Sequence, residues 1–238
     1  MSLLEILVGC FVYAVGCTLQ GVLGFGANLL AVPILALINP DFVPGPVLLI
    51  NPLLSGFFTI RERGSTDKYG LTWTIIGRLP GIVLAVFALS VVAEEKIGVL
   101  FGSLLLFAIA LKLSGLKFER SQKNLMLGGC VSGFMGTAVG VGGPPIALLY
   151  HDVSGPVLRA TLSPYFLIGT AISITALAVT GNFDSGDLLI CLFLLPAAIA
   201  GMAISGPLRK TLNQKWITSG IYFLSGSAAI TLLIRSLF

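Results

Sequence analysis

Only 10% of the 238 residues are charged, 56% are hydrophobic and the mean hydropathy is +1.01. Soluble domains carry roughly 25% charged residues, so this composition excludes a water-soluble globular protein. The net charge of +4 does not indicate a nucleic-acid partner, because Lys and Arg lie between the apolar runs, as is usual in membrane proteins.

Apolar runs follow one another along the chain, at about 6–38, 42–60, 69–93, 97–116, 124–150, 161–180, 188–207 and 216–234. Several reach the roughly 20 residues that a helix needs to cross a bilayer. Period-two alternation is weak, which speaks against an outer-membrane barrel. The runs predict an all-α integral membrane protein surrounded by lipid. No basic region precedes the first run, so a cleaved secretory signal is not expected.

The first run is too long for one simple crossing. As a single helix, Leu3–Ile38 would extend about 54 Å at 1.5 Å per residue, whereas the hydrocarbon core is about 30 Å thick. Gly24, Phe25 and Gly26 interrupt it, and Asn28 follows the break. The run therefore either crosses steeply tilted or turns back at this break.

The run 124–150 contains a stronger break of the same kind. Three glycines and two prolines stand close together there, at Gly140, Gly142, Gly143, Pro144 and Pro145. Proline lacks an amide donor and cannot continue a helix interior. In hydrocarbon, broken backbone survives only where protein or a water-filled cavity satisfies its polar groups. One break in each half of a chain indicates a transport site.

The chain also contains an internal repeat. An offset of 116 residues aligns Gly24 with Gly140, Gly26 with Gly142, and Leu79-Pro80 with Leu195-Pro196. We therefore predict two homologous halves, 1–118 and 119–238, joined by the basic linker 117–123.

The distribution of basic residues distinguishes between two possible topologies. Four plain crossings per half, starting inside, would put five basic residues outside and leave nine of 14 inside. If both broken runs are re-entrant hairpins and the N-terminus is outside, only Lys96 and Arg235 of the 14 remain outside. The positive-inside rule favours the hairpins. Each half then has one hairpin and three crossings, so the halves are inverted repeats whose tips meet near the midplane.

The two hairpin tips are the predicted binding site. A helix that begins just after a break offers unpaired amides and a partial positive charge, which suit an anion. Pro144 and Pro145 fit a first helical turn, where no donor is lost. Asn28 occupies the position equivalent to Pro144 and could add a side-chain amide. The alternative is that these glycines only permit close helix packing.

Four further residues are candidates for substrate contact. Arg78 lies inside the run 69–93, where it could draw anions toward the tips or extend to the interface. Asn51 precedes Pro52 in an apolar run and could face the cavity. Thr161 and Ser163 could bond substrate, although such residues more often cap helices.

No motif predicts an enzyme, a cofactor or a metal. Gly24-x-Gly26 lacks the third glycine of a dinucleotide fingerprint, and no Cys or His spacing suits a metal. The four cysteines all lie in apolar segments, where they suit packing. Membrane aspartate pairs, Gly-x-Ser-x-Gly and His-Glu-x-x-His are absent, which disfavours a membrane-bound enzyme.

The tip 140–145, the earlier stretch 21–26, the tripeptide Arg159-Ala160-Thr161 and the two-half layout resemble the TauE/SafE family over essentially the whole chain. The resemblance implies a multi-pass protein of the bacterial inner membrane that exports sulfite or a related organosulfur acid. The residues themselves do not distinguish sulfite from another small sulfonate or carboxylate.

Together these features predict a secondary transporter of a small anion that works by alternating access. A passive anion channel is the alternative, which counterflow would separate from a transporter. The coupling ion, the direction of transport and the assembly, with a homodimer as one option, are left open.

Overall fold

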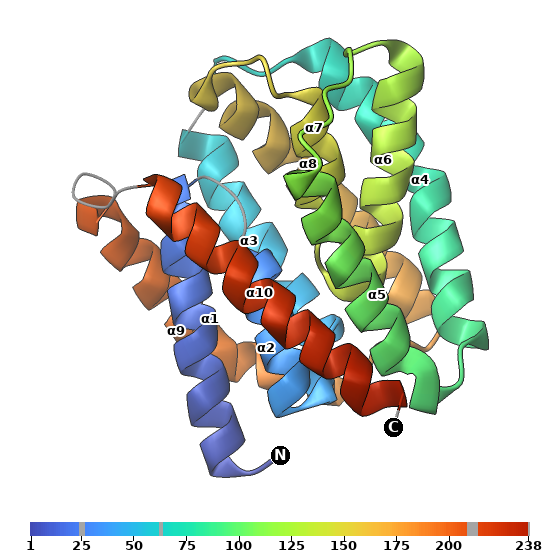
Figure 1. Ribbon diagram of the computed structural model, residues 1–238, viewed down its shortest axis with the longest axis vertical. Coiled ribbons are helices and arrows are strands. Elements are labelled where there is room, and N and C mark those ends of the chain that lie inside the picture. Colours follow the sequence, from blue (N-terminus) through green and yellow to red (C-terminus); the bar gives the residue numbers. More distant parts are fainter. Residues whose placement is uncertain (24–26, 62–63, 209–213, 238) are drawn as a thin grey trace.

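The computed structural model describes residues 1–23, 27–61, 64–208 and 214–237, which contain helices and no β-strand (Figure 1). This confirms the predicted all-α class. The helices are, in chain order, α1 (Leu3–Leu23), α2 (Ala27–Ile38), the 3₁₀ turn η1 (Pro40–Phe42), α3 (Gly45–Arg61), α4 (Lys68–Val91), α5 (Glu94–Leu113), α6 (Gln122–Val139), α7 (Gly143–Leu149), α8 (Gly155–Val179), α9 (Ser185–Leu208) and α10 (Gln214–Leu237).

Seven helices of the described chain are long and apolar enough to cross a membrane: α1, α3, α4, α5, α8, α9 and α10. Leucine, isoleucine, valine and phenylalanine side chains are exposed on their outer faces, as lipid requires. The sequence led us to expect six crossings besides two hairpins. The seventh is α1, because the first arm of the first hairpin is a predominantly apolar span of 20 residues, Leu3–Val22.

Both broken runs turn back on themselves. The ring of Phe42, which follows α2, lies against Gly9 of α1, so α2 returns toward the end where α1 starts. Likewise Arg120, just before α6, pairs with Asp152, just after α7, at 3.3 Å. The two arms of each hairpin are unequal, since α2 has 12 residues and α7 has 7.

The two hairpins start from opposite ends of the molecule. Both chain termini lie at the lower end in Figure 1, whereas the connection from α5 to α6 lies at the upper end. Gly45 at the start of α3 lies against Asp187 near the start of α9, so these two helices begin at the same end of the molecule. The inverted relation of the halves 1–118 and 119–238, and the side of the membrane that each end faces, stay predictions.

Close packing of α4 on α6 positions the centre of the molecule. Gly77 and Gly81 of α4 face α6, and Gly129 and Gly133 of α6 face α4. A Cβ at any of these positions would run into the backbone of the other helix. Small residues four apart allow such close approach in membranes. Arg78 directly follows Gly77 in α4, so it lies next to this close contact between α4 and α6.

Candidate functional site

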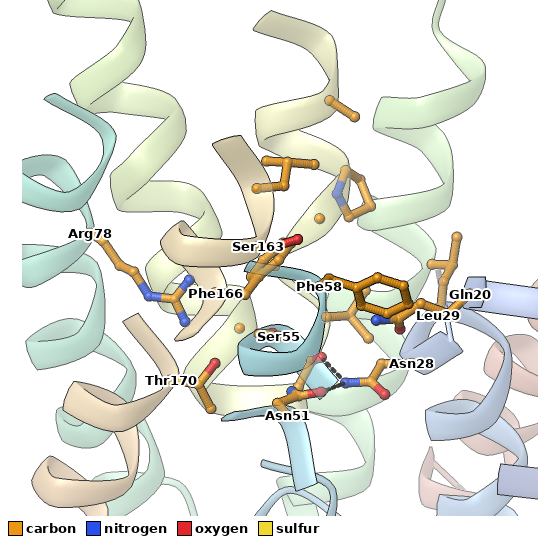
Figure 2. Close-up of a pocket in the computed structure, with 18 of the residues that line it drawn as sticks. Gln20, Asn28, Leu29, Asn51, Ser55, Phe58, Arg78, Ser163, Phe166 and Thr170 are labelled. Atoms are coloured by element: carbon orange, nitrogen blue, oxygen red, sulfur yellow. Dashed lines mark hydrogen bonds between the residues drawn. The ribbon is translucent and has the colours of Figure 1, made fainter. Parts of the chain in front are cut away.

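A cavity lies between the hairpin helices and α3, α4, α5 and α8 (Figure 2). Its volume is about 80 Å³. One water needs roughly 10–15 Å³ of such space, so several waters or one small ion fit. It is lined by Gln20, Asn28, Leu29, Asn51, Ser55, Phe58, Arg78, Lys112, Gly136, Gly140, Val141, Gly142, Gly143, Pro144, Ala147, Leu162, Ser163, Phe166 and Thr170.

Arg78 is the buried cation of this cavity. Only 1% of its surface is exposed, and its Nε and Nη1 atoms have no hydrogen-bond partner among the described residues. The guanidinium carbon lies 4.9 Å from the centre of the Tyr165 ring, a cation–π contact. No Asp or Glu is among the described residues that line the cavity. The positive charge of Arg78 is thus buried beside the cavity, and no carboxylate of the described lining residues neutralises it.

Glycines on two helices make room for this side chain. A Cβ on Gly169 of α8 would lie 2.5 Å from the Arg78 Cζ atom, and one on Gly133 of α6 would lie 2.8 Å from its Cγ atom. A Cβ on Gly136 would come 3.2 Å from Nη2. These helices are therefore shaped around an extended arginine, which explains how α4 can hold it in the interior.

A side-chain amide connects the two hairpins. Nδ2 of Asn28, in the first turn of α2, donates to the carbonyl of Gly140 at 2.9 Å and to Oδ1 of Asn51 at 3.2 Å (Figure 2). The Gly140 carbonyl can only accept, so the amide nitrogen must face it. The break in the second hairpin is thus tied to the start of α2 and to α3.

The second tip is fixed by its backbone and by two hydroxyls. Gly140 ends α6 with a φ of 74°, in the left-handed region that favours glycine. Pro145 is buried in the first turn of α7 and, unlike Pro144, does not line the cavity. Ser132 of α6 donates to the Gly142 carbonyl, and the Tyr165 hydroxyl donates to Ser132 at 2.8 Å. Tyr165, whose ring lies beside the Arg78 guanidinium, therefore also helps to hold the second tip in place.

The tip glycines differ in what surrounds them. A Cβ on Gly142 would come 2.7 Å from the Ser132 carbonyl oxygen, so this position requires close packing on α6. A Cβ on Gly143 would meet only the Phe166 ring, at 3.9 Å. Packing therefore explains Gly142 but not Gly143. Anion binding by the amides of these two residues stays a prediction.

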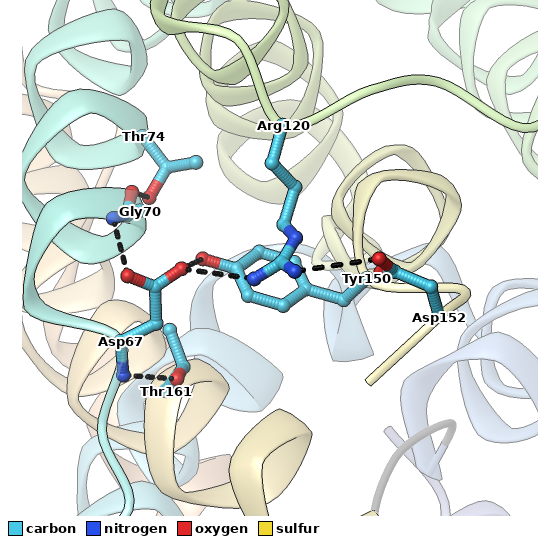
Figure 3. A network of polar contacts seen from close by, with 7 residues as sticks. All are labelled: Asp67, Gly70, Thr74, Arg120, Tyr150, Asp152 and Thr161. Atoms are coloured by element: carbon cyan, nitrogen blue, oxygen red, sulfur yellow. Dashed lines mark hydrogen bonds and ion pairs between the residues drawn. The ribbon is translucent and has the colours of Figure 1, made fainter. Parts of the chain in front are cut away.

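The two residues predicted at the start of α8 lie in different places. Ser163 lines the cavity, and its hydroxyl donates to the Arg159 carbonyl at 2.8 Å. Thr161 is not among the lining residues. Its hydroxyl oxygen accepts a hydrogen bond of 3.0 Å from the backbone amide of Asp67 (Figure 3).

Thr161 belongs to a polar network at the end where the α6–α7 hairpin starts (Figure 3). Arg120 pairs with Asp67 at 3.5 Å and with Asp152 at 3.3 Å, and its guanidinium lies 5.5 Å from the Tyr150 ring centre. Tyr150 donates to Asp67 at 3.1 Å. Burial and the charge of Asp67 raise the pKa of Tyr150 above its ordinary range. The network joins three helix connections and fastens the C-terminal end of α7.

The structure brings most of the predicted site residues together around one cavity: Asn28, Asn51, Arg78, Gly140, Gly142, Gly143, Pro144 and Ser163. Gly24, Phe25 and Gly26 lie outside the described residues. Sequence reasoning missed the polar and aromatic neighbours on α3 and α8. Ser55 and Phe58 follow the predicted Asn51 at i+4 and i+7. That spacing on one helix face was the signal that could have found them.

Comparison with known proteins agrees with this architecture. The family model described as Sulfite exporter TauE/SafE matches residues 8–232, nearly the whole chain. No curated protein and no solved structure matches this chain.

Proposed function

Because this chain belongs to the sulfite exporter TauE/SafE family, we propose that it carries sulfite or a small organosulfur acid across the membrane. The family is a transporter family, and seven helices of the described chain can cross a bilayer. The composition and the all-helical fold fit a multi-pass protein. We assign it to the bacterial inner membrane, the location that the resemblance implies.

The observation that carries the binding site is the buried Arg78 guanidinium beside the cavity. A buried charge without a partner is destabilising by several kcal/mol, whereas a well-bonded counter-ion offsets that penalty. Nε and Nη1 of Arg78 have no partner in the part of the chain that the structure describes, and a planar guanidinium can donate two parallel hydrogen bonds to one oxyanion group. A small anion supplies the missing charge and the missing acceptors.

Amides and hydroxyls around the cavity complete the proposed site. Asn51, Ser163 and Thr170 line the same cavity as Arg78, and the backbone of the second tip forms another part of its wall. We propose that the anion binds here between the hairpins, and that the halves move around it in alternating access. The bond between Asn28 and the Gly140 carbonyl is one contact that such a movement would change.

Replacing Arg78 by Met tests the site. Loss of hydrogen bonds to a charged group is worth about 1.5–3 kcal/mol, so sulfite affinity should fall about 10- to 150-fold. The variant should still fold, since the substitution removes a buried charge that is itself unfavourable by several kcal/mol when no counter-ion is bound. Sulfite titration and thermal unfolding of detergent-purified protein measure both quantities.

The matched control is Arg235→Met, because Arg235 is an exposed arginine at the end of α10. It should bind sulfite like the unmodified protein. Equal affinity in the Arg78 variant would contradict the proposed site.

A counterflow experiment separates a transporter from a channel. In liposomes that contain the unmodified protein, preloaded unlabelled sulfite should accelerate the uptake of labelled sulfite. Uptake without such exchange would instead indicate a channel.

A further inference from the structure

Among the described residues that line the cavity, Arg78 is the one fully buried cation. Arg78 is almost completely buried, whereas the other described polar side chains of the wall, apart from Lys112, are amides and hydroxyls, at Gln20, Asn28, Asn51, Ser55, Ser163 and Thr170. Lys112, the other basic residue of the lining, lies in the last turn of α5 and is half-buried. Because Lys112 is less buried than Arg78, its charge is screened more.

This charge determines which anions the cavity can hold. A singly charged anion beside Arg78 makes a neutral pair. A dianion in the same place leaves one negative charge uncompensated where water has been removed, and each uncompensated buried ion is unfavourable by several kcal/mol. The cavity volume of about 80 Å³ leaves little room for a hydration shell that would travel with the ligand.

We propose that the site selects singly charged anions over dianions of the same size. The ligand class is then hydrogen sulfite, or a sulfonate or carboxylate with a single charge, and neither the sulfite dianion nor sulfate. This selection rests on the proposed function, since it concerns the anion bound beside Arg78.

The donors and acceptors of the cavity suit a hydrogen oxyanion. Nε and Nη1 of Arg78, which no described residue engages, are donors for its charged oxygens. A protonated oxygen needs an acceptor, and the hydroxyl groups of Ser55 and Thr170 can accept as well as donate. A fully ionised dianion offers no proton to these groups.

Ionisable protein groups near Arg78 have to be separated from ionisation of the ligand. The two helices packed beside Arg78 present Gly133 and Gly136 from α6, and Tyr165 and Gly169 from α8. Around the cavity, Lys112 comes from α5. Tyr165 and Lys112 are the ionisable groups among these described neighbours. A ligand with one charge at every pH therefore serves as the control.

The experiment measures the Kd of sulfite for the purified full chain, from one pH unit below to one unit above the second ionisation of sulfite. Only the hydrogen form is competent, so the apparent Kd should rise about tenfold across this range. Methanesulfonate, which keeps one charge throughout, should bind with a constant Kd. Sulfate should compete weakly at every pH.

A sulfite Kd that stays level or falls as the pH rises would overturn the charge selection and leave anion binding intact. The same applies if sulfite and methanesulfonate weaken in parallel, because a protein group would then be titrating. Failure of all these anions to bind would instead overturn the proposed function and the selection together.

Discussion

Arg78 shows how a charged residue can be held inside an apolar helix. The side chain does not extend to the interface, because Gly133, Gly136 and Gly169 leave a passage for it between α6 and α8. Its methylene groups pack in this passage, and the Tyr165 ring lies beside the guanidinium. Position in the sequence alone left both outcomes open, and the structure places the guanidinium in the cavity wall.

The glycine passage can be tested without changing any charge. In Gly169→Ala, the new methyl group would collide with Nε, Cδ and Cζ of Arg78 and displace the guanidinium. Because its hydrogen bonds to the anion would be misaligned, sulfite affinity should fall about 10- to 150-fold. A binding titration on purified protein provides the measurement.

Gly206→Ala is the control for this substitution. It adds the same methyl group to another helix, α9, where no atom lies within 4 Å of the new Cβ. It should bind like the unmodified protein and unfold at the same or a slightly higher temperature, since alanine favours helix by about 1 kcal/mol over glycine. Comparable losses of affinity in both variants would refute a specific role for the passage.

The α6–α7 hairpin is held at both of its ends. Ser132 and Tyr165 fix the Gly142 carbonyl at the tip, and the network of Asp67, Arg120 and Tyr150 fixes the other end. The exposed ion pairs of that network contribute little stability individually, typically below about 1 kcal/mol. The buried hydroxyl chain at the tip is therefore the stronger constraint on α7.

Ser132→Ala should loosen the tip. The substitution removes the donor to Gly142 and leaves the Tyr165 hydroxyl without its acceptor. A net loss of about 0.5–1.5 kcal/mol should increase local opening roughly two- to tenfold. Hydrogen exchange of the peptide that covers residues 140–149 should accelerate accordingly.

Ser227→Ala is the matched control, because this hydroxyl is exposed on α10 and donates to the Leu224 carbonyl of its own helix. Exchange of the same peptide should be unchanged there. If Ser132→Ala also leaves this exchange unchanged, the hydroxyl chain does not hold the tip.

Helix positions and the break of the second hairpin could be predicted from the sequence, whereas side-chain neighbours could not. Long apolar runs specify helices by their length, and clustered glycine and proline specify the interruption between α6 and α7. The break predicted at Gly24–Gly26 lies outside the described residues. Thr161 and Ser163 stand two apart on one helix, so they point in different directions, and only Ser163 reaches the cavity. The passage for Arg78 depends on packing between helices far apart in the chain, which no local pattern encodes.

At the scale of the whole molecule, helix packing comes in related pairs. When α1 to α5 are matched in order with α6 to α10, the contact of α4 with α6 corresponds to that of α1 with α9, and the contact of α2 with α10 corresponds to that of α5 with α7. The contacts of α3 with α8 and of α5 with α10 each join a helix to its own counterpart. Exchanging each helix of 1–118 with its counterpart in 119–238 leaves this set of contacts unchanged. We therefore propose that the two halves are inverted repeats, and this exchange of contacts supports the proposal.

The orientation in the membrane is predicted from charge. Asn182 lies in the connection from α8 to α9, and Lys117 lies in the connection from α5 to α6. In a variant without the four native cysteines, Asn182→Cys should react with a membrane-impermeant maleimide in intact cells. Lys117→Cys should react only after permeabilisation, since basic connections stay in the cytoplasm.

The reverse pattern would contradict the predicted orientation. Reaction of both cysteines in intact cells would contradict the placement of these two connections on opposite sides of the membrane.

The position of Arg78 has a consequence for biosynthesis. α4 leaves the ribosome before α6 and α8, the helices that enclose its arginine. An arginine at the centre of a newly inserted helix is unfavourable by about 2.5–3.5 kcal/mol on translocon scales, and a lone helix relieves this by shifting toward the interface. We therefore expect α4 to lie at a shallower depth in the newly inserted first half, and to move to its final depth after α6 and α8 have been inserted.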